Sequence, residues 1–146
     1  MGVGGWGLDE EDKHMADLEN SVVRSYRDLV VWQRAMTLAE QVYAVTKSFP
    51  KEEVYGLTSQ MRRAAVSIAS NIAEDNGRQS RGEFLQSLGH ARGSLAELHT
   101  QVTLAARLKL MSPADEQSLS ESIASVGRPL NGLRKSLKSP TKNPKT

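Results

Sequence analysis

A helical period repeated four times is the feature that most constrains how this chain folds. Between residues 26 and 137, apolar side chains recur at alternating spacings of three and four, which places them along one face of an α-helix. Prolines, glycines and capping residues separate the four stretches. Amphipathic helices joined by short loops bury their apolar faces against one another. We therefore predict an all-α fold, an antiparallel up-down four-helix bundle without strands.

The first two helices are bounded by signals on both sides. The first is expected over about 29–48, with Asp28 as its cap and Pro50 as its stop, since proline removes a backbone donor. The second is expected over about 55–75, followed by Asn76-Gly77. The predicted core seams are Leu29, Trp32, Met36, Ala39, Tyr43 and Thr46 in the first helix and Leu57, Met61, Ala64, Ala65, Ile68 and Ile72 in the second.

The last two helices have recognisable start signals. Ser80 and Glu83 have the spacing of a capping box and open a third helix that ends near Leu110. Ser112-Pro113 opens the fourth, because proline suits the first helical position. Pro129 within the fourth pattern predicts a bend rather than a fifth helix. The seams are Phe84, Leu88, Ala91, Leu95, Leu98, Val102 and Ala105, then Leu119, Ile123, Val126, Leu130, Leu133 and Leu137.

Amino-acid composition indicates the domain boundaries, the cellular compartment and the kinds of site that this chain cannot form. We expect residues 1–25, rich in glycine and acid, to be a flexible leader, 26–137 to be the bundle and 138–146 to be a flexible basic tail. The absence of cysteine excludes a disulfide framework, a zinc ribbon and a thiol nucleophile, and suits a reducing cytosol. No apolar run approaches the roughly 18 residues of a membrane span. A cytoplasmic protein without a membrane partner is expected.

Catalytic and metal-binding readings find little support in the residue spacings. His90 and His99 lie nine apart, on opposite sides of a helix, so they cannot share a metal. Glu97 is followed three residues later by Thr100, whereas the glutamate-histidine motif of di-iron bundles needs a histidine at that position. We expect no catalytic residue, metal or cofactor. One alternative stays open, a metal-independent ribonuclease using Arg92 and His99, which share a helical face.

Four arginines on the hairpin formed by the second and third helices are candidates for binding nucleic acid. They are Arg62, Arg63, Arg78 and Arg81. Guanidinium groups fork onto the phosphates of RNA or DNA, although the chain's formal net charge of only +2 requires the fold to gather them. The alternative is that they form ion pairs within or between subunits. The acidic partners would then be Glu74, Asp75, Glu83 and Glu97.

A stripe of small residues on the third helix is a candidate contact between subunits. Interior glycine destabilises a helix by about 1 kcal/mol relative to alanine, so its presence suggests close approach of another backbone. The alternative is neutral surface variation. The predicted interface residues are Gly89, Gly93 and Ala96, together with a second row on the preceding helix, Val66, Ala69 and Ala73.

Several motifs closely resemble the bacterial four-helix-bundle proteins first associated with intervening sequences in 23S rRNA genes. They are Tyr26-Arg27-Asp28-Leu29, Tyr55-Gly56-Leu57-Thr58-Ser59-Gln60, Arg62-Arg63-Ala64-Ala65-Val66-Ser67-Ile68, Ser70-Asn71-Ile72-Ala73-Glu74 and Gly93-Ser94-Leu95-Ala96-Glu97-Leu98. The resemblance covers about 26–137. It implies an up-down bundle and, as in the related accessory variability protein of diversity-generating retroelements, a ring-shaped homopentamer that binds nucleic acid through basic residues.

The leading functional hypothesis is a non-enzymatic oligomeric bundle with an rRNA-associated, nucleic-acid-binding role. Its partners would be further copies of itself and RNA or DNA. The rival is an oligomeric scaffold that binds another protein and whose arginines form only ion pairs. The ribonuclease ranks third, because Arg92 and His99 lie about 10 Å apart along the helix and would need groups from a second chain.

Overall fold

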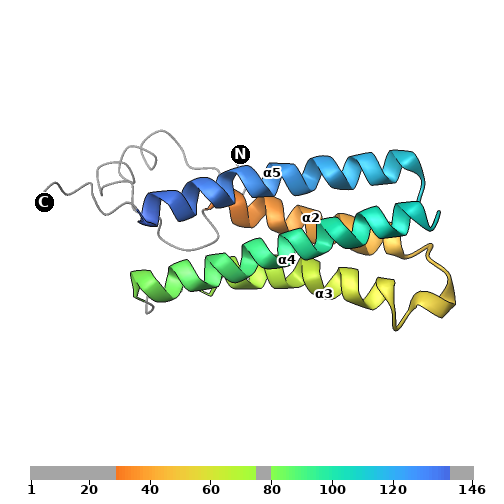
Figure 1. The fold of residues 1–146 in the computed structure, drawn as a ribbon, viewed down its shortest axis with the longest axis horizontal. Coiled ribbons are helices and arrows are strands. Elements are labelled where there is room, and N and C mark those ends of the chain that lie inside the picture. Colours follow the sequence, from red (N-terminus) through yellow and green to blue (C-terminus); the bar gives the residue numbers. More distant parts are fainter. Residues whose placement is uncertain (1–28, 75–79, 139–146) are drawn as a thin grey trace, which may run out of the picture.

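The computed structural model describes residues 29–74 and 80–138, which form four α-helices, one short 3-10 turn and no strand. Figure 1 shows the four helices running back and forth along one long axis. The predicted all-α, four-helix fold is confirmed. The elements are α2 (Val30–Thr46), η2 (Lys51–Glu53), α3 (Leu57–Ile72), α4 (Arg81–Arg107) and α5 (Pro113–Lys138).

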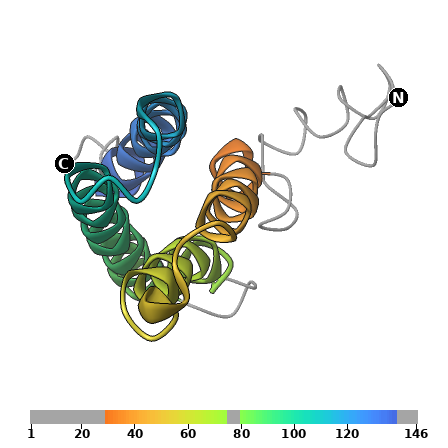
Figure 2. The same cartoon turned by 90° about the vertical axis from the view of Figure 1, so that its right-hand side faces the viewer.

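Each helix packs against its neighbours in the chain, and α2 also packs against α5, so the helices close into a four-sided arrangement. The end-on view in Figure 2 shows this order around the bundle. No helix in the described part of the chain is both long and apolar enough to cross a membrane. Residues 1–28, the Asn76-Gly77 stop and the tail from 139 onward lie outside the described residues, and with them the predicted Asp28 cap.

Both predicted start signals of the later helices are confirmed. The Ser80 hydroxyl accepts from the Glu83 amide at 3.1 Å, and the Glu83 carboxylate accepts from the Ser80 amide at 3.1 Å. These reciprocal bonds satisfy two of the amides that a helix start leaves unpaired. At α5, the Ser112 hydroxyl accepts from the Asp115 amide at 3.1 Å.

The α4 helix ends three residues earlier than expected, at Arg107. Lys109 adopts a left-handed conformation with φ 62°. The Leu110 amide then donates to the Ala105 carbonyl at 2.9 Å, and the Lys109 amide donates to the Ala106 carbonyl at 3.0 Å. This is the Schellman arrangement that satisfies the last carbonyls of a helix, here built without the usual glycine.

The core lies along the predicted seams of α3, α4 and α5. Every predicted seam residue of α3 is buried, while Phe84 on α4 and Leu133 and Leu137 on α5 are partly buried at the margin. On α4, Leu88, Leu98 and Val102 have no exposed area. The periodicity of these three helices therefore identified both the helix and its buried face.

The predicted buried face of α2 was wrong, because the core is formed by the neighbouring row of apolar side chains on this helix. Met36 is 39% exposed and Tyr43 is 44% exposed, so both face outward. Of the predicted seam only Thr46 is buried, whereas Leu29, Trp32 and Ala39 are partly buried. Two apolar rows lie side by side on this helix, and the row of smaller side chains faces the core because α3 and α5 approach α2 closely there. The buried residues of α2 are Val31, Ala35, Leu38, Val42 and Thr46.

Pro129 lies inside α5, which remains one helix from Pro113 to Lys138, so no fifth helix forms. A proline has no amide, so the carbonyl of Ser125, four residues earlier, loses its helical partner. The Arg34 guanidinium of α2 donates to that carbonyl at 3.0 Å. Nearby, a Cβ added to Gly127 would lie 3.4 Å from Leu95 Cδ2, which shows how closely α5 approaches α4. The helix therefore continues through Gly127 and Pro129, where packing against α4 and the hydrogen bond from Arg34 compensate for the missing amide.

Candidate nucleic-acid interface

Two surface grooves flank α3, and neighbouring arginines face one each. Residues 62 and 63 are turned by about 100° from each other around a helix. Arg62 lines the groove between α2 and α3, and Arg63 lines the groove between α3 and α4. The two predicted site residues therefore have separate surroundings.

Arg62 is held against the end of α2. Its Nε donates to Thr46 Oγ1 at 2.8 Å, one Nη donates to the Tyr43 carbonyl at 3.4 Å, and the guanidinium carbon lies 4.5 Å from the centre of the Tyr43 ring. Thr46 is 2% exposed, and its hydroxyl in turn donates to the Val42 carbonyl at 2.8 Å. A cation at a helix C-terminus is favoured by the helix dipole and satisfies carbonyls left without amides. Arg62 therefore joins α3 to α2.

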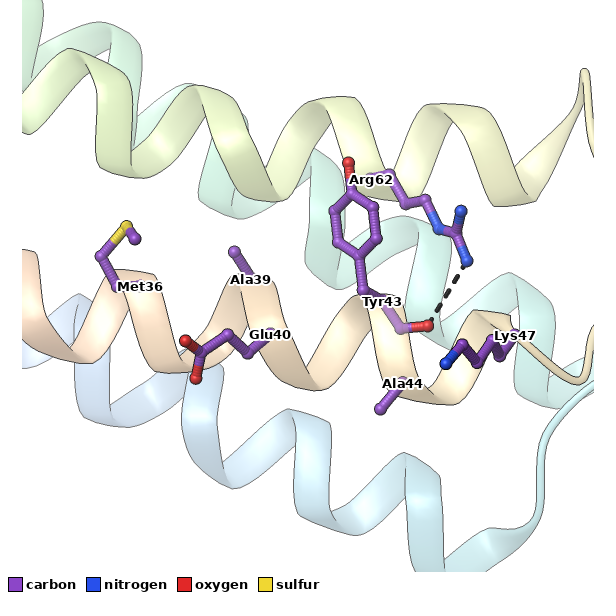
Figure 3. A pocket seen from close by; sticks show the side chains of 7 residues that line it. All are labelled: Met36, Ala39, Glu40, Tyr43, Ala44, Lys47 and Arg62. Carbon is purple, nitrogen blue, oxygen red and sulfur yellow. Dashed lines mark hydrogen bonds between the residues drawn. The ribbon is translucent and has the colours of Figure 1, made fainter.

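The groove beside Arg62 is largely apolar. Figure 3 shows Arg62 beside the Tyr43 ring, with Met36 and Ala39 further along α2. The groove has a volume of about 530 Å³. Its walls combine exposed apolar side chains with one acidic and two basic groups. The lining residues are Met36, Ala39, Glu40, Tyr43, Ala44, Lys47 and Arg62.

The groove beside Arg63 is mainly polar and has a volume of about 500 Å³. Its floor is a contact between helices, in which the Ser67 and Ser94 hydroxyls lie 2.9 Å apart. Arg63 is exposed and makes no hydrogen bond or ion pair with any residue that the structure describes. Its guanidinium is free to bind an anion. The lining residues are Tyr55, Ser59, Gln60, Arg63, Ala64, Ser67, Ser94 and Glu97.

Of the other two predicted arginines, the structure describes Arg81, which is not beside Arg63. Arg81 is exposed at the first position of α4, at the end of the α3–α4 hairpin where α3 finishes. The helical rise puts Arg63 about 14 Å along α3 from its last residue, Ile72. Arg78 lies outside the described residues. Within one chain, Arg63 and Arg81 thus lie at different places along the hairpin.

Two of the acidic partners considered for these arginines, Glu83 and Glu97, have other contacts. Glu83 caps the start of α4, and Glu97 Oε2 accepts from Gln101 Nε2 at 3.4 Å. Within residues 29–74 and 80–138, neither carboxylate pairs with Arg62, Arg63 or Arg81. Asp75 lies outside the described residues. Ion pairing within the subunit therefore does not account for Arg63.

The predicted small-residue interface divides into exposed and buried positions. Gly93 and Ala96 are exposed, and a Cβ added to Gly93 would meet nothing within 4 Å. A Cβ added to Gly89 would lie 3.8 Å from a guanidinium nitrogen of Arg134 on α5, so this glycine faces its own chain. On α3, Val66 is 43% exposed, Ala73 is half-buried and Ala69 is only 6% exposed. Ala69 thus already belongs to the core of its own bundle.

The ribonuclease pair lies on α4, away from both grooves beside α3. Arg92 and His99 are both exposed on α4, and neither lines the grooves beside α3. In the described part of the chain, no three His, Asp or Glu side chains are grouped as a metal site requires.

Sequence reasoning missed Tyr55 as a site residue. Tyr55 is 93% exposed and lines the polar groove. The signal is the Tyr55-Gly56 step, where the sequence pattern predicts the start of a helix. The structure instead makes a turn there, because Glu53 Oε1 accepts from the Leu57 amide at 3.1 Å and caps α3. A Cβ on Gly56 would lie 2.9 Å from that oxygen, so glycine leaves room for the capping carboxylate.

The fold and its grooves define a class, an all-α four-helix protein with a free arginine in a polar surface groove. A model of the 23S rRNA-intervening sequence protein family matches residues 27–132, and the chain belongs to that family. The family description names no reaction.

A solved structure has the same fold. It is the crystal structure of a protein with unknown function from the S23 ribosomal protein family of Bacteroides thetaiotaomicron VPI-5482. It matches with a TM-score of 0.67 at 22% identity, over 73% of this chain and 96% of that chain. At this identity the likeness concerns the fold alone. No curated protein matches the chain.

Proposed function

We propose that this protein is a cytoplasmic, non-enzymatic oligomer that binds nucleic acid, with an rRNA-associated role. The observation that carries the proposal is the free guanidinium of Arg63, exposed in a polar groove beside hydroxyl and amide groups. Arginine without an internal partner is suited to phosphate, which it binds through two parallel hydrogen bonds. Membership of the 23S rRNA-intervening sequence protein family supports the same direction.

Assembly would supply the affinity that one subunit lacks. A net charge of +2 is too small to hold a phosphate backbone, and Arg63 and Arg81 lie at different parts of one hairpin. A ring of five subunits, as the family resemblance implies, would repeat each arginine five times around one axis. The exposed small residues Gly93 and Ala96 offer a face on which helices of two subunits could approach closely.

The salt dependence of RNA binding tests the proposal. Each phosphate contact contributes roughly 0.7 to 0.9 to the slope of log affinity against log salt. We expect a steep slope for the wild type and a shallower one for Arg63→Ala, at every RNA sequence. Arg128→Ala, which removes an exposed arginine from α5, is the matched control. A wild type that binds no RNA even at low salt would leave the protein-binding scaffold as the better account.

Light scattering tests the assembly. Gly93 and Gly132 are both exposed helical glycines with nothing within 4 Å of an added Cβ. Gly93→Leu is expected to reduce the oligomeric mass, whereas Gly132→Leu on α5 should not. A 16.0 kDa monomer for the wild type at micromolar concentration would exclude the oligomer. An intact assembly in Gly93→Leu would make the stripe ordinary surface.

A further inference from the structure

We propose that the groove between α3 and α4 binds an unpaired base of single-stranded nucleic acid. The base ring stacks on Tyr55, the neighbouring phosphate binds Arg63, and the base edge donates to Glu97. This inference rests on the proposed function and adds to it the form of nucleic acid recognised and the part of the nucleotide read.

Tyr55 has the properties of a stacking platform. It is 93% exposed, against 44% for Tyr43 and 8% for Phe49, so the bundle makes almost no use of its ring. The backbone beneath it is fixed on both sides. The Gly56 amide donates to the Glu53 carbonyl at 2.9 Å, and the Glu53 carboxylate caps α3 one residue later. An aromatic ring presented on a fixed turn stacks on any base, because every base has a π-face.

Arg63 lies in the same groove, on the first half of α3. The groove brings it together with the Tyr55 ring and with the hydroxyls of Ser59, Ser67 and Ser94. A nucleotide whose base covers Tyr55 carries its phosphate only one sugar away from that base. The unpartnered guanidinium is the cation in this groove that can neutralise that phosphate.

Glu97, on the α4 wall, favours a base edge rather than a second phosphate. Gln101 Nε2 donates to Glu97 Oε2, which leaves Oε1 without a partner among the described residues. The α4 wall of the groove therefore offers one carboxylate oxygen as an acceptor. A carboxylate accepts from the N4 amino group of cytosine and is repelled by O4, the acceptor that uracil presents at the same position.

The stacking contact requires a base that is not paired. In a duplex the Watson–Crick edges are occupied and the ring faces are stacked on their neighbours. The groove therefore distinguishes a single strand from a duplex, and cytosine from uracil, through different side chains.

The experiment measures fluorescence anisotropy of short labelled RNAs with the assembled protein. The RNAs are oligocytidine, oligouridine, and a mixed sequence alone or annealed to its complement. Tyr55→Ser should weaken single-strand binding roughly fivefold or more, while Tyr55→Phe, which keeps the ring, should bind as the wild type does. Tyr55 is almost fully exposed, so neither change should affect folding. Glu97→Gln should remove the wild-type preference for oligocytidine over oligouridine, expected at roughly fivefold.

The outcomes separate this inference from the proposed function. If the wild type binds RNA with a steep salt slope but Tyr55→Ser binds equally well, the stacking site is wrong and the proposed function stands. Equal affinity for single strand and duplex would have the same meaning. Equal affinity for oligocytidine and oligouridine would remove Glu97 from the site. Absence of RNA binding by the wild type would overturn both proposals.

Discussion

The grooves on the two sides of α3 differ in what they do with an arginine. In the α2–α3 groove, Arg62 is bound by a hydroxyl, a carbonyl and a ring of the neighbouring helix. In the α3–α4 groove, the adjacent Arg63 has no such partner among the described residues. The difference arises from the facing helix, since α2 ends beside Arg62 and presents its last carbonyls, whereas α4 passes Arg63 in mid-helix. Adjacent identical residues can therefore have separate roles, one in stability and one on the surface.

The largest expected effect comes from a core substitution on α3, the helix that both grooves share. Ile68, on the inward face of α3, has no exposed area. Ile68→Ala should lower the free energy of unfolding by about 2 to 5 kcal/mol, because it leaves a cavity in the core. Ser70→Ala, two residues away at an exposed position, is the control and should change it by about 0.5 kcal/mol or less. Urea unfolding followed by circular dichroism measures both. Equal losses in the two variants would contradict the burial of this face.

The next effect tests the contrast between the two arginines directly. Arg62→Ala should destabilise the bundle by about 1 to 2 kcal/mol, because the buried Thr46 hydroxyl loses its donor and Tyr43 loses the stacked cation. Arg63→Ala should change the free energy of unfolding by less than about 0.5 kcal/mol. Thermal and urea unfolding of the two variants provides the measurement.

A conservative change checks the reason for the Arg62 effect. Arg62→Lys keeps the charge but has no planar group to stack on Tyr43 while donating to Thr46, so most of the loss should remain. Full recovery by lysine would mean that charge alone matters at this position. Equal stabilities of Arg62→Ala and Arg63→Ala would contradict the comparison of the two grooves.

The smallest expected effect is a gain in stability at the end of α4. A more stable variant is a useful parent protein in which to measure the destabilising substitutions above. Lys109 has φ 62°, a conformation that disfavours residues with a Cβ, so Lys109→Gly should stabilise the bundle by about 1 kcal/mol. Lys47, the residue after α2, has φ −59° and gains nothing from glycine. Lys47→Gly should therefore destabilise by about 0.5 to 1 kcal/mol. Midpoints of thermal unfolding that move in the same direction for both variants would rule out strain at Lys109.

The sequence predicted the helices and three of four buried faces because periodicity was unambiguous there. On α3, α4 and α5 only one row at helical spacing is apolar throughout. On α2 two rows compete, and the larger side chains of Met36 and Tyr43 suggested the wrong one. Periodicity gives the spacing of a row. The choice between two adjacent rows depends on how much space the neighbouring helices leave, which is a property of the packed bundle.

The candidate site could be predicted only in part. The arginines were visible as residues, but the contact of Arg62 with Thr46 joins positions 16 apart on different helices. Which arginine is bound and which is free depends on where α2 ends. Tyr55 gave a weaker signal still, since its exposure follows from the turn that Glu53 and Gly56 make before α3. Neither fact is encoded in a local pattern.

The hydrogen bond from Arg34 to the Ser125 carbonyl has a consequence for the order of folding. It joins residues 91 apart, along the edge where α2 meets α5. Closing so long a loop loses more chain entropy than pairing α3 with α4, which follow one another directly. We expect the α3–α4 hairpin to form early and the α2–α5 edge to form last. By the same reasoning, amide hydrogens of α2 and α5 should exchange with solvent through local opening before those of α3 and α4, beginning at the turn where Pro129 contributes no amide.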